Sequence, residues 1–149
     1  MIGRIIGLDV GDRRIGISVS DALGITAQGV ETYTRPDDDL AADVAHIIAV
    51  CRQYAPFRIV CGMPRNMNGT YGPQTEKVRE FAKALKAAYP CEYDFYDERL
   101  TTVSATRVLL DADMSRKKRK QVVDKIAAVI ILQDYLDSGS PARPPKEEV

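Results

Sequence analysis

The chain has 149 residues, of which 45% are hydrophobic and 28% charged, a composition typical of one globular domain large enough to bury its own core. Its 21 Lys and Arg balance its 21 Asp and Glu, which excludes polyanion binding by bulk charge and requires any nucleic-acid surface to be local. Three cysteines without a Cys-x-x-Cys spacing predict reduced thiols, and the lack of a signal-peptide pattern or a long apolar run predicts a cytoplasmic protein with no membrane partner.

The N-terminal segment predicts a β-hairpin. Residues 4–10 form an apolar run interrupted near its end by Asp9, and a Gly-Asp-Arg turn leads into residues 15–19, where every second side chain is apolar. An ionised carboxylate at the end of a buried strand is costly unless a cation or hydrogen-bond donors compensate it. Asp9 is therefore a candidate metal ligand or phosphate-site residue. The alternative is a turn Asp that caps its own backbone.

After a third strand, the chain alternates between helix and strand. The patterns predict strands at 27–33, 58–62 and 92–96 and helices at 40–54, 74–88, about 102–110 and 122–136. The five consecutive basic residues 116–120 are expected to form a solvated, mobile loop because like charges repel. Residues 139–149, rich in Gly, Ser, Pro and charge, predict a disordered tail behind a single domain of residues 1–138.

Three carboxylates from distant segments are candidates for one site. Asp9 ends the first strand, Glu98 follows the fifth, and Asp124 lies near the start of the last helix. Ligands gather at the carboxyl ends of parallel strands, and three clustered carboxylates need cations, so we expect one or two Mg or Mn ions there. For Glu98 the alternative is a capping box or surface pair. For Asp124 it is an ordinary helix N-terminal Asp, which the spacing alone favours.

The motifs of the whole chain resemble one family. They are Gly7-Leu8-Asp9-Val10-Gly11, Gly62-Met63-Pro64, Asp97-Glu98-Arg99-Leu100-Thr101-Thr102 and Asp124-Lys125-Ile126-Ala127-Ala128. Together they resemble the YqgF (RuvX-type) family, bacterial proteins described as Holliday-junction resolvases and as nucleases of ribosomal RNA maturation, in the ribonuclease H-like superfamily. The resemblance implies an α/β ribonuclease H-like fold with a five-stranded mixed sheet of order 3-2-1-4-5 flanked by helices. It also implies that Asp9, Glu98 and Asp124 are the catalytic and metal-binding residues.

One feature departs from the wider superfamily. The second acidic residue usually follows the fourth strand, where this chain has Gly62-Met63-Pro64, so Glu98 after the fifth strand must replace it.

The implied function is metal-dependent hydrolysis of phosphodiester bonds at the 5′ end of precursor ribosomal RNA, by a monomer or weak homodimer that prefers RNA to DNA. The residues expected to bind substrate are basic or carry hydroxyl groups: Arg13, Arg65, Arg99, Thr101, Thr102, Arg116, Lys117, Lys118, Arg119 and Lys120. Alternatives are junction resolution, a non-catalytic nucleic-acid-binding module, and nucleotide phosphate binding of the actin and sugar-kinase type. For Arg99 an ion pair with a neighbouring carboxylate is an alternative.

Overall fold

The computed structural model describes residues 3–64, 72–98 and 116–144, with the backbone alone described for 116–124. In this part of the chain, five strands form one mixed sheet of order β3-β2-β1-β4-β5, which confirms the predicted topology. The first three strands pair antiparallel, and β4 and β5 continue the sheet parallel to β1. The strands are β1 (Ile5–Val10), β2 (Arg14–Ser20), β3 (Ala27–Thr34), β4 (Arg58–Met63) and β5 (Glu92–Asp97).

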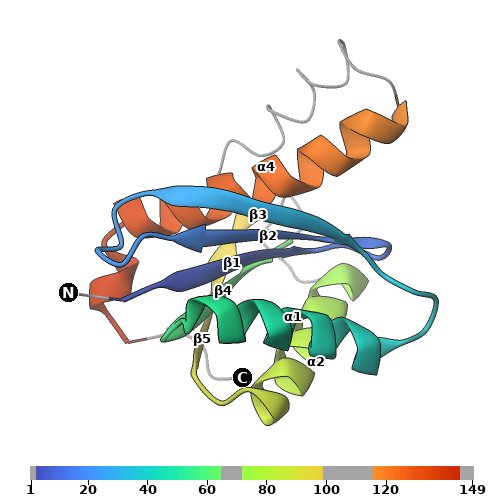
Figure 1. Cartoon of the computed structure of the whole chain (residues 1–149), viewed down its shortest axis with the longest axis horizontal. Helices are drawn as coiled ribbons and strands as arrows, with labels where there is room; N and C mark the ends of the chain where they lie inside the picture. The colour runs from blue at the N-terminus through green and yellow to red at the C-terminus, as the bar shows by residue number, and fades with distance from the viewer. Residues whose placement is uncertain (1–2, 65–71, 99–115, 145–149) are drawn as a thin grey trace.

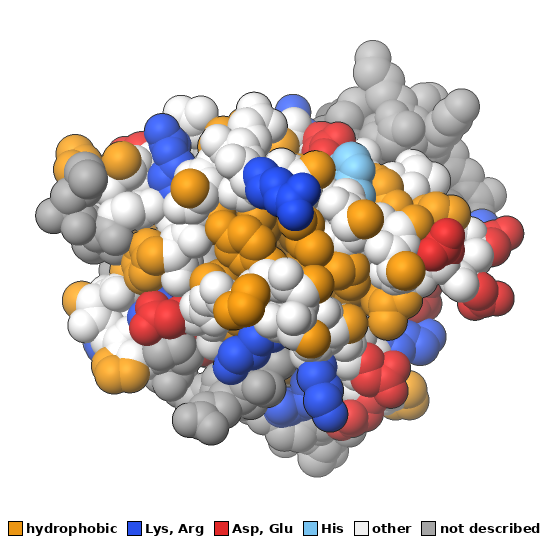
Figure 2. Space-filling model, turned by 60° about the horizontal axis from the view of Figure 1, so that its bottom comes forward, with side chains coloured by type: hydrophobic (Ala, Val, Ile, Leu, Met, Phe, Trp, Pro, Cys, Tyr) orange, Lys and Arg blue, Asp and Glu red, His pale blue; other side chains and the backbone are white. Residues whose placement is uncertain are grey.

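Helices cover both faces of the sheet (Figure 1). On one face lie α1 (Leu40–Tyr54), which begins where Asp39 caps the backbone N–H of Ala42, and α2 (Pro73–Ala88). On the other face lies α4 (Arg116–Asp137), which packs across β1, β2 and β3. Seen from the side of α1 and α2, hydrophobic side chains gather at the centre of the surface and charged ones surround them (Figure 2). None of the described helices is long and apolar enough to span a membrane.

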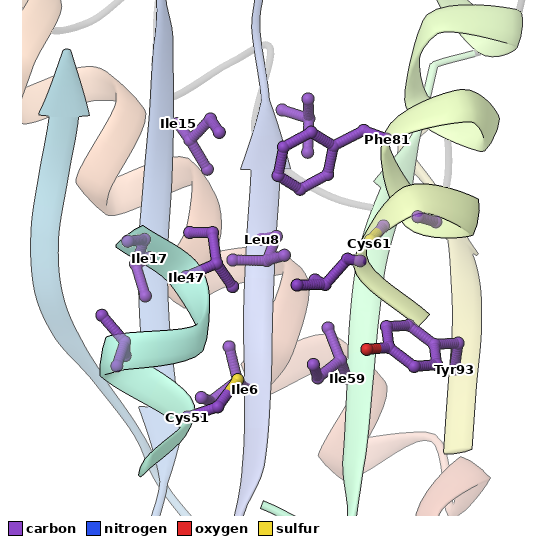
Figure 3. Close-up of a cluster of buried hydrophobic side chains, with 14 of the residues drawn as sticks. Ile6, Leu8, Ile15, Ile17, Ile47, Cys51, Ile59, Cys61, Phe81 and Tyr93 are labelled. Atoms are coloured by element: carbon purple, nitrogen blue, oxygen red, sulfur yellow. The ribbon is translucent and has the colours of Figure 1, made fainter. Parts of the chain in front are cut away.

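The alternation of side chains along β1 decides which residues face which helices. Ile6, Leu8 and Val10 are buried in the main core. Figure 3 shows Ile6 and Leu8 beside the core residues of α1 and α2. Because successive strand residues point to opposite faces, Gly7 and Asp9 lie on the α4 side. The strand therefore places its one carboxylate on the face that α4 covers.

Gly7 lets α4 lie directly on the sheet. A Cβ atom at this position would stand 2.8 Å from the Cβ of Leu132 and 2.5 Å from Ser18 Oγ, which is too close for any real contact. The hydroxyl of Ser18 donates a 2.8 Å hydrogen bond to the carbonyl of Ala128. This close approach fixes the distance between α4 and β1.

A buried polar network joins the C-terminal half of α4 to the sheet. The guanidinium of Arg58 donates to the Tyr135 hydroxyl at 2.9 Å, and that hydroxyl donates to Asp94 Oδ2 at 2.7 Å. All three residues are at most 4% exposed. Burial, and then the hydrogen bond to Asp94, raise the pKa of Tyr135. The phenol therefore stays protonated and holds the helix to β4 and β5.

Two sequence-based expectations need correction. The last helix begins at Arg116 rather than at residue 122, so the basic residues 116–120 are helical and not a loop. Arg and Lys are good helix formers, and each like-charge pair in a helix costs only a few tenths of a kcal/mol. Residues 140–142, expected to be disordered, form a short 3-10 helix, η2 (Ser140–Ala142), because Arg58 donates to the carbonyls of Ser140 and Arg143.

The three cysteines are free, as predicted. The helix predicted at 102–110 lies outside the described residues.

Candidate active site

Two of the three predicted carboxylates line one cavity. Asp9, only 9% exposed, stands at the end of β1, and Glu98 follows the end of β5, two strands away in the sheet. Both belong to the α4 side of the sheet by strand alternation. They lie in the wall of a cavity of about 190 Å³, whose other lining residues are Val10, Gly11, Gly62, Pro64 and Gln74. The structure thus brings Asp9 and Glu98 to one cavity at the carboxyl edge of the sheet.

Gly62 makes room for the Glu98 carboxylate. It lies in β4, between the strands that carry the two acids, and pairs with Tyr96 of β5. A Cβ atom on Gly62 would lie 2.9 Å from Glu98 Oε1 and 2.6 Å from Ile131 Cδ1. Gly62 therefore presents only backbone at this point of β4, and the side chain of Glu98 crosses over it.

The donor set of this cavity suits a hard divalent cation. Carboxylate oxygens are the ligands that Mg²⁺ and Mn²⁺ prefer, and two carboxylates beside a small cavity would repel each other without positive charge. Among the side chains that the structure describes, no group of three or more His, Cys, Asp or Glu could hold a metal. Asp124, the predicted third ligand, lies in α4, but its side chain is outside the described part.

Of the predicted substrate-binding residues, Arg13 is the one whose side chain is described. It is exposed on the β1–β2 turn and lines a larger hollow of about 680 Å³, which also takes in residues of α1 and α2. Residues 116–120 occupy the start of α4, with their side chains outside the described part. The remaining four predicted residues lie wholly outside it: Arg65, Arg99, Thr101 and Thr102.

Sequence reasoning missed one polar side chain of the site. Gln74 lines the cavity together with Asp9 and Glu98, from the first turn of α2. Its sequence signal was its position directly after Pro73, which begins a helix at the end of a long loop.

The sheet order β3-β2-β1-β4-β5, with helices on both faces, is that of a ribonuclease H-like fold. Two solved structures share this fold. Thermus thermophilus RuvC in complex with a Holliday junction substrate has a TM-score of 0.60 at 14% identity, with 96% of this chain and 99% of that chain covered. The yeast mitochondrial Holliday junction resolvase Ydc2 has a TM-score of 0.55 at 11% identity, with 94% of this chain and 80% of that one covered.

The chain belongs to the family described as "RuvX: Holliday junction resolvase", whose family model matches residues 3–138. Two curated relatives are named "Putative pre-16S rRNA nuclease". The protein of Heliobacterium modesticaldum is 55% identical over 135 residues, which cover 91% of this chain and 89% of the relative. The protein of Clostridium botulinum is 56% identical over 137 residues, which cover 92% of this chain and 98% of the relative. The predicted family, fold and nuclease class are confirmed.

Proposed function

We propose that this protein hydrolyses phosphodiester bonds of precursor ribosomal RNA at the cavity between Asp9 and Glu98. The observation that carries the proposal is the meeting of these two acids, from distant parts of the chain, at one cavity on the carboxyl edge of the sheet. The names of the relatives supply the substrate class. The acids would hold one or two divalent ions, which supply Lewis-acid catalysis of phosphodiester hydrolysis when bound.

We also propose Asp124 as the third acid. The C-terminal end of α4 packs on the start of β1, and Ala128 and Leu132 both lie over Gly7, so the helix runs antiparallel to the strand. Four residues of helix span about 6 Å, and two residues of strand span about 6.6 Å. The helix turn from Asp124 to Ala128 is therefore level with Asp9, two residues after Gly7. This register supports the convergence of three acids.

The substrate backbone would contact the start of α4. The helix has no acidic residue in its first turn and begins with five basic residues, which is unfavourable beside the positive end of the helix dipole. A polyanion relieves this repulsion. For single-stranded RNA, replacing Lys117 or Lys118 by Ala should each reduce the slope of log affinity against log salt by about 0.7. An unchanged slope would exclude these residues from binding.

The decisive assay measures Mn²⁺-dependent cleavage of a precursor ribosomal RNA fragment, with a four-way DNA junction as a parallel substrate. Asp9→Asn and Glu98→Gln should each lower the cleavage rate by about 100-fold or more, because each removes a ligand worth several kcal/mol. Asp137→Asn, an exposed carboxylate at the far end of α4, is the matched control. Wild-type activity in Asp9→Asn would refute the proposal.

Cleavage of the junction alone would favour the second candidate, resolution of DNA junctions. The description of the family model and the fold of the solved resolvases support that candidate.

A further inference from the structure

Arg35, on the face of the sheet opposite to α4, forms hydrogen bonds to the turn that follows Asp9. Arg35 follows β3, and its Nη1 donates a 2.7 Å hydrogen bond to the carbonyl of Gly11, while its backbone N–H donates to the carbonyl of Arg13 at 2.8 Å. Gly11 lines the cavity that holds Asp9 and Glu98. The side chain of Arg35 therefore acts on the wall of the candidate site without entering it.

A buried carboxylate on α1 holds this arginine in place. Arg35 Nε donates to Asp43 Oδ2 at 2.8 Å, and the side chains are 20% and 1% exposed. The guanidinium also lies over the ring of Phe81 on α2, with Cζ 5.7 Å from the ring centroid. Because a guanidinium is a planar, rigid fork, fixing Nε and the plane also fixes the direction of Nη1. Two helices thus orient one donor toward Gly11.

Burying the Arg35–Asp43 ion pair costs desolvation free energy, because the charges are taken out of water. Asp43 Oδ1 is buried and has no hydrogen-bond partner in the described part of the chain. Buried ion pairs can often be replaced by apolar side chains with no loss of stability, and in some proteins their value lies in the geometry that they specify. Here the guanidinium that Asp43 holds donates to the carbonyl of Gly11 in the β1–β2 turn.

We propose that Arg35, oriented by Asp43, is a positioning residue that fixes the Gly11 turn and through it the Asp9 carboxylate. This inference rests on the proposed function, because Asp9 needs a fixed position only if it holds a catalytic ion. Groups that orient the ligands of a metal site change metal affinity or activity by about 10–100-fold when they are removed. Arg35 acts one step further away, through the backbone, so we expect its removal to lower metal affinity or activity by about tenfold.

The test compares the variant Arg35→Met/Asp43→Leu with the wild type. The double replacement removes both charges together, so no unpaired carboxylate stays buried, but it also removes the donor to Gly11. Arg35→Lys keeps the positive charge beside Asp43 and serves as the conservative variant. Arg4→Met is the matched control, since Arg4 donates a 3.0 Å hydrogen bond to the carbonyl of Ser20 at the opposite edge of the sheet.

Two measurements decide the outcome. In the double variant, the Gly11 amide, bonded to the carbonyl of Arg14, should exchange with deuterium about tenfold faster, and half-maximal cleavage should need about tenfold more Mn²⁺, with partial recovery in Arg35→Lys. Arg4→Met should change neither quantity. Wild-type exchange and Mn²⁺ dependence in the double variant would overturn the inference. An inactive wild type would instead refute the proposed function, and the exchange comparison would still decide whether Arg35 fixes the turn.

Discussion

The replacement of Gly62 by alanine tests how Glu98 is placed. The new Cβ would stand 2.9 Å from Glu98 Oε1, 3.3 Å from Glu98 Cγ and 2.6 Å from Ile131 Cδ1. Ordinary contact begins at 3.4 Å, so the carboxylate oxygen must retreat by about 0.5 Å. Catalytic groups must be held within about 0.5 Å, and a displacement of 1 Å can cost about 100-fold, so we expect a loss of about tenfold in cleavage rate.

The same alanine also strains the packing of α4. Overpacking a core costs about 1–3 kcal/mol, which corresponds to a fall in Tm of roughly 2–12 °C for a domain of this size. Ile131→Val removes the Cδ1 atom that the new Cβ would meet, but leaves Glu98 in contact with it. In Gly62→Ala/Ile131→Val we therefore expect Tm to recover in large part while cleavage stays low.

The assay is the initial rate of Mn²⁺-dependent RNA cleavage per folded molecule, alongside thermal unfolding by circular dichroism. Ile131→Val alone is the control for the lost methyl group and should cost about 0.5–1.5 kcal/mol of stability. If the double variant regained cleavage together with Tm, the loss in Gly62→Ala would come from the position of α4. The argument that Gly62 makes room for Glu98 would then fail.

Three further predictions concern other parts of the fold. Tyr135→Phe should lower the free energy of unfolding, measured in urea, by about 1–3 kcal/mol, because the buried side chains of Arg58 and Asp94 each lose one hydrogen bond. Cleavage per folded molecule should stay unchanged. Burial and then the charge of Asp137 raise the pKa of Asp134, so the folded protein loses stability as the pH rises from the usual carboxyl pKa through the raised one. Asp134→Asn should therefore raise Tm at pH 7 and leave it unchanged at pH 3. Burial raises the pKa of the Cys51 and Cys61 thiols to about 12, so both should resist a thiol reagent at pH 8 until the protein unfolds, and early labelling of either would contradict their burial.

Local sequence patterns were enough to predict most elements of this fold. The alternation in residues 15–19 and the helical spacing in 40–54 report which side of each element is apolar, and that property is local. The basic residues 116–120 were misassigned because their mutual repulsion is small compared with the helix propensity of Arg and Lys and the continuation of α4.

What the sequence by itself determined is most of the elements that the structure describes and, through the family motifs, their order in the sheet; it also predicts which acids form the site. What only the tertiary structure decided is how these acids are held: the missing side chain at Gly62 over which Glu98 passes, and the bond from Arg35 to Gly11. Such contacts join segments that are distant in sequence and depend on differences of a few tenths of an ångström in packing. No periodicity within one segment can encode them, because they arise only when strands and helices from different parts of the chain come together.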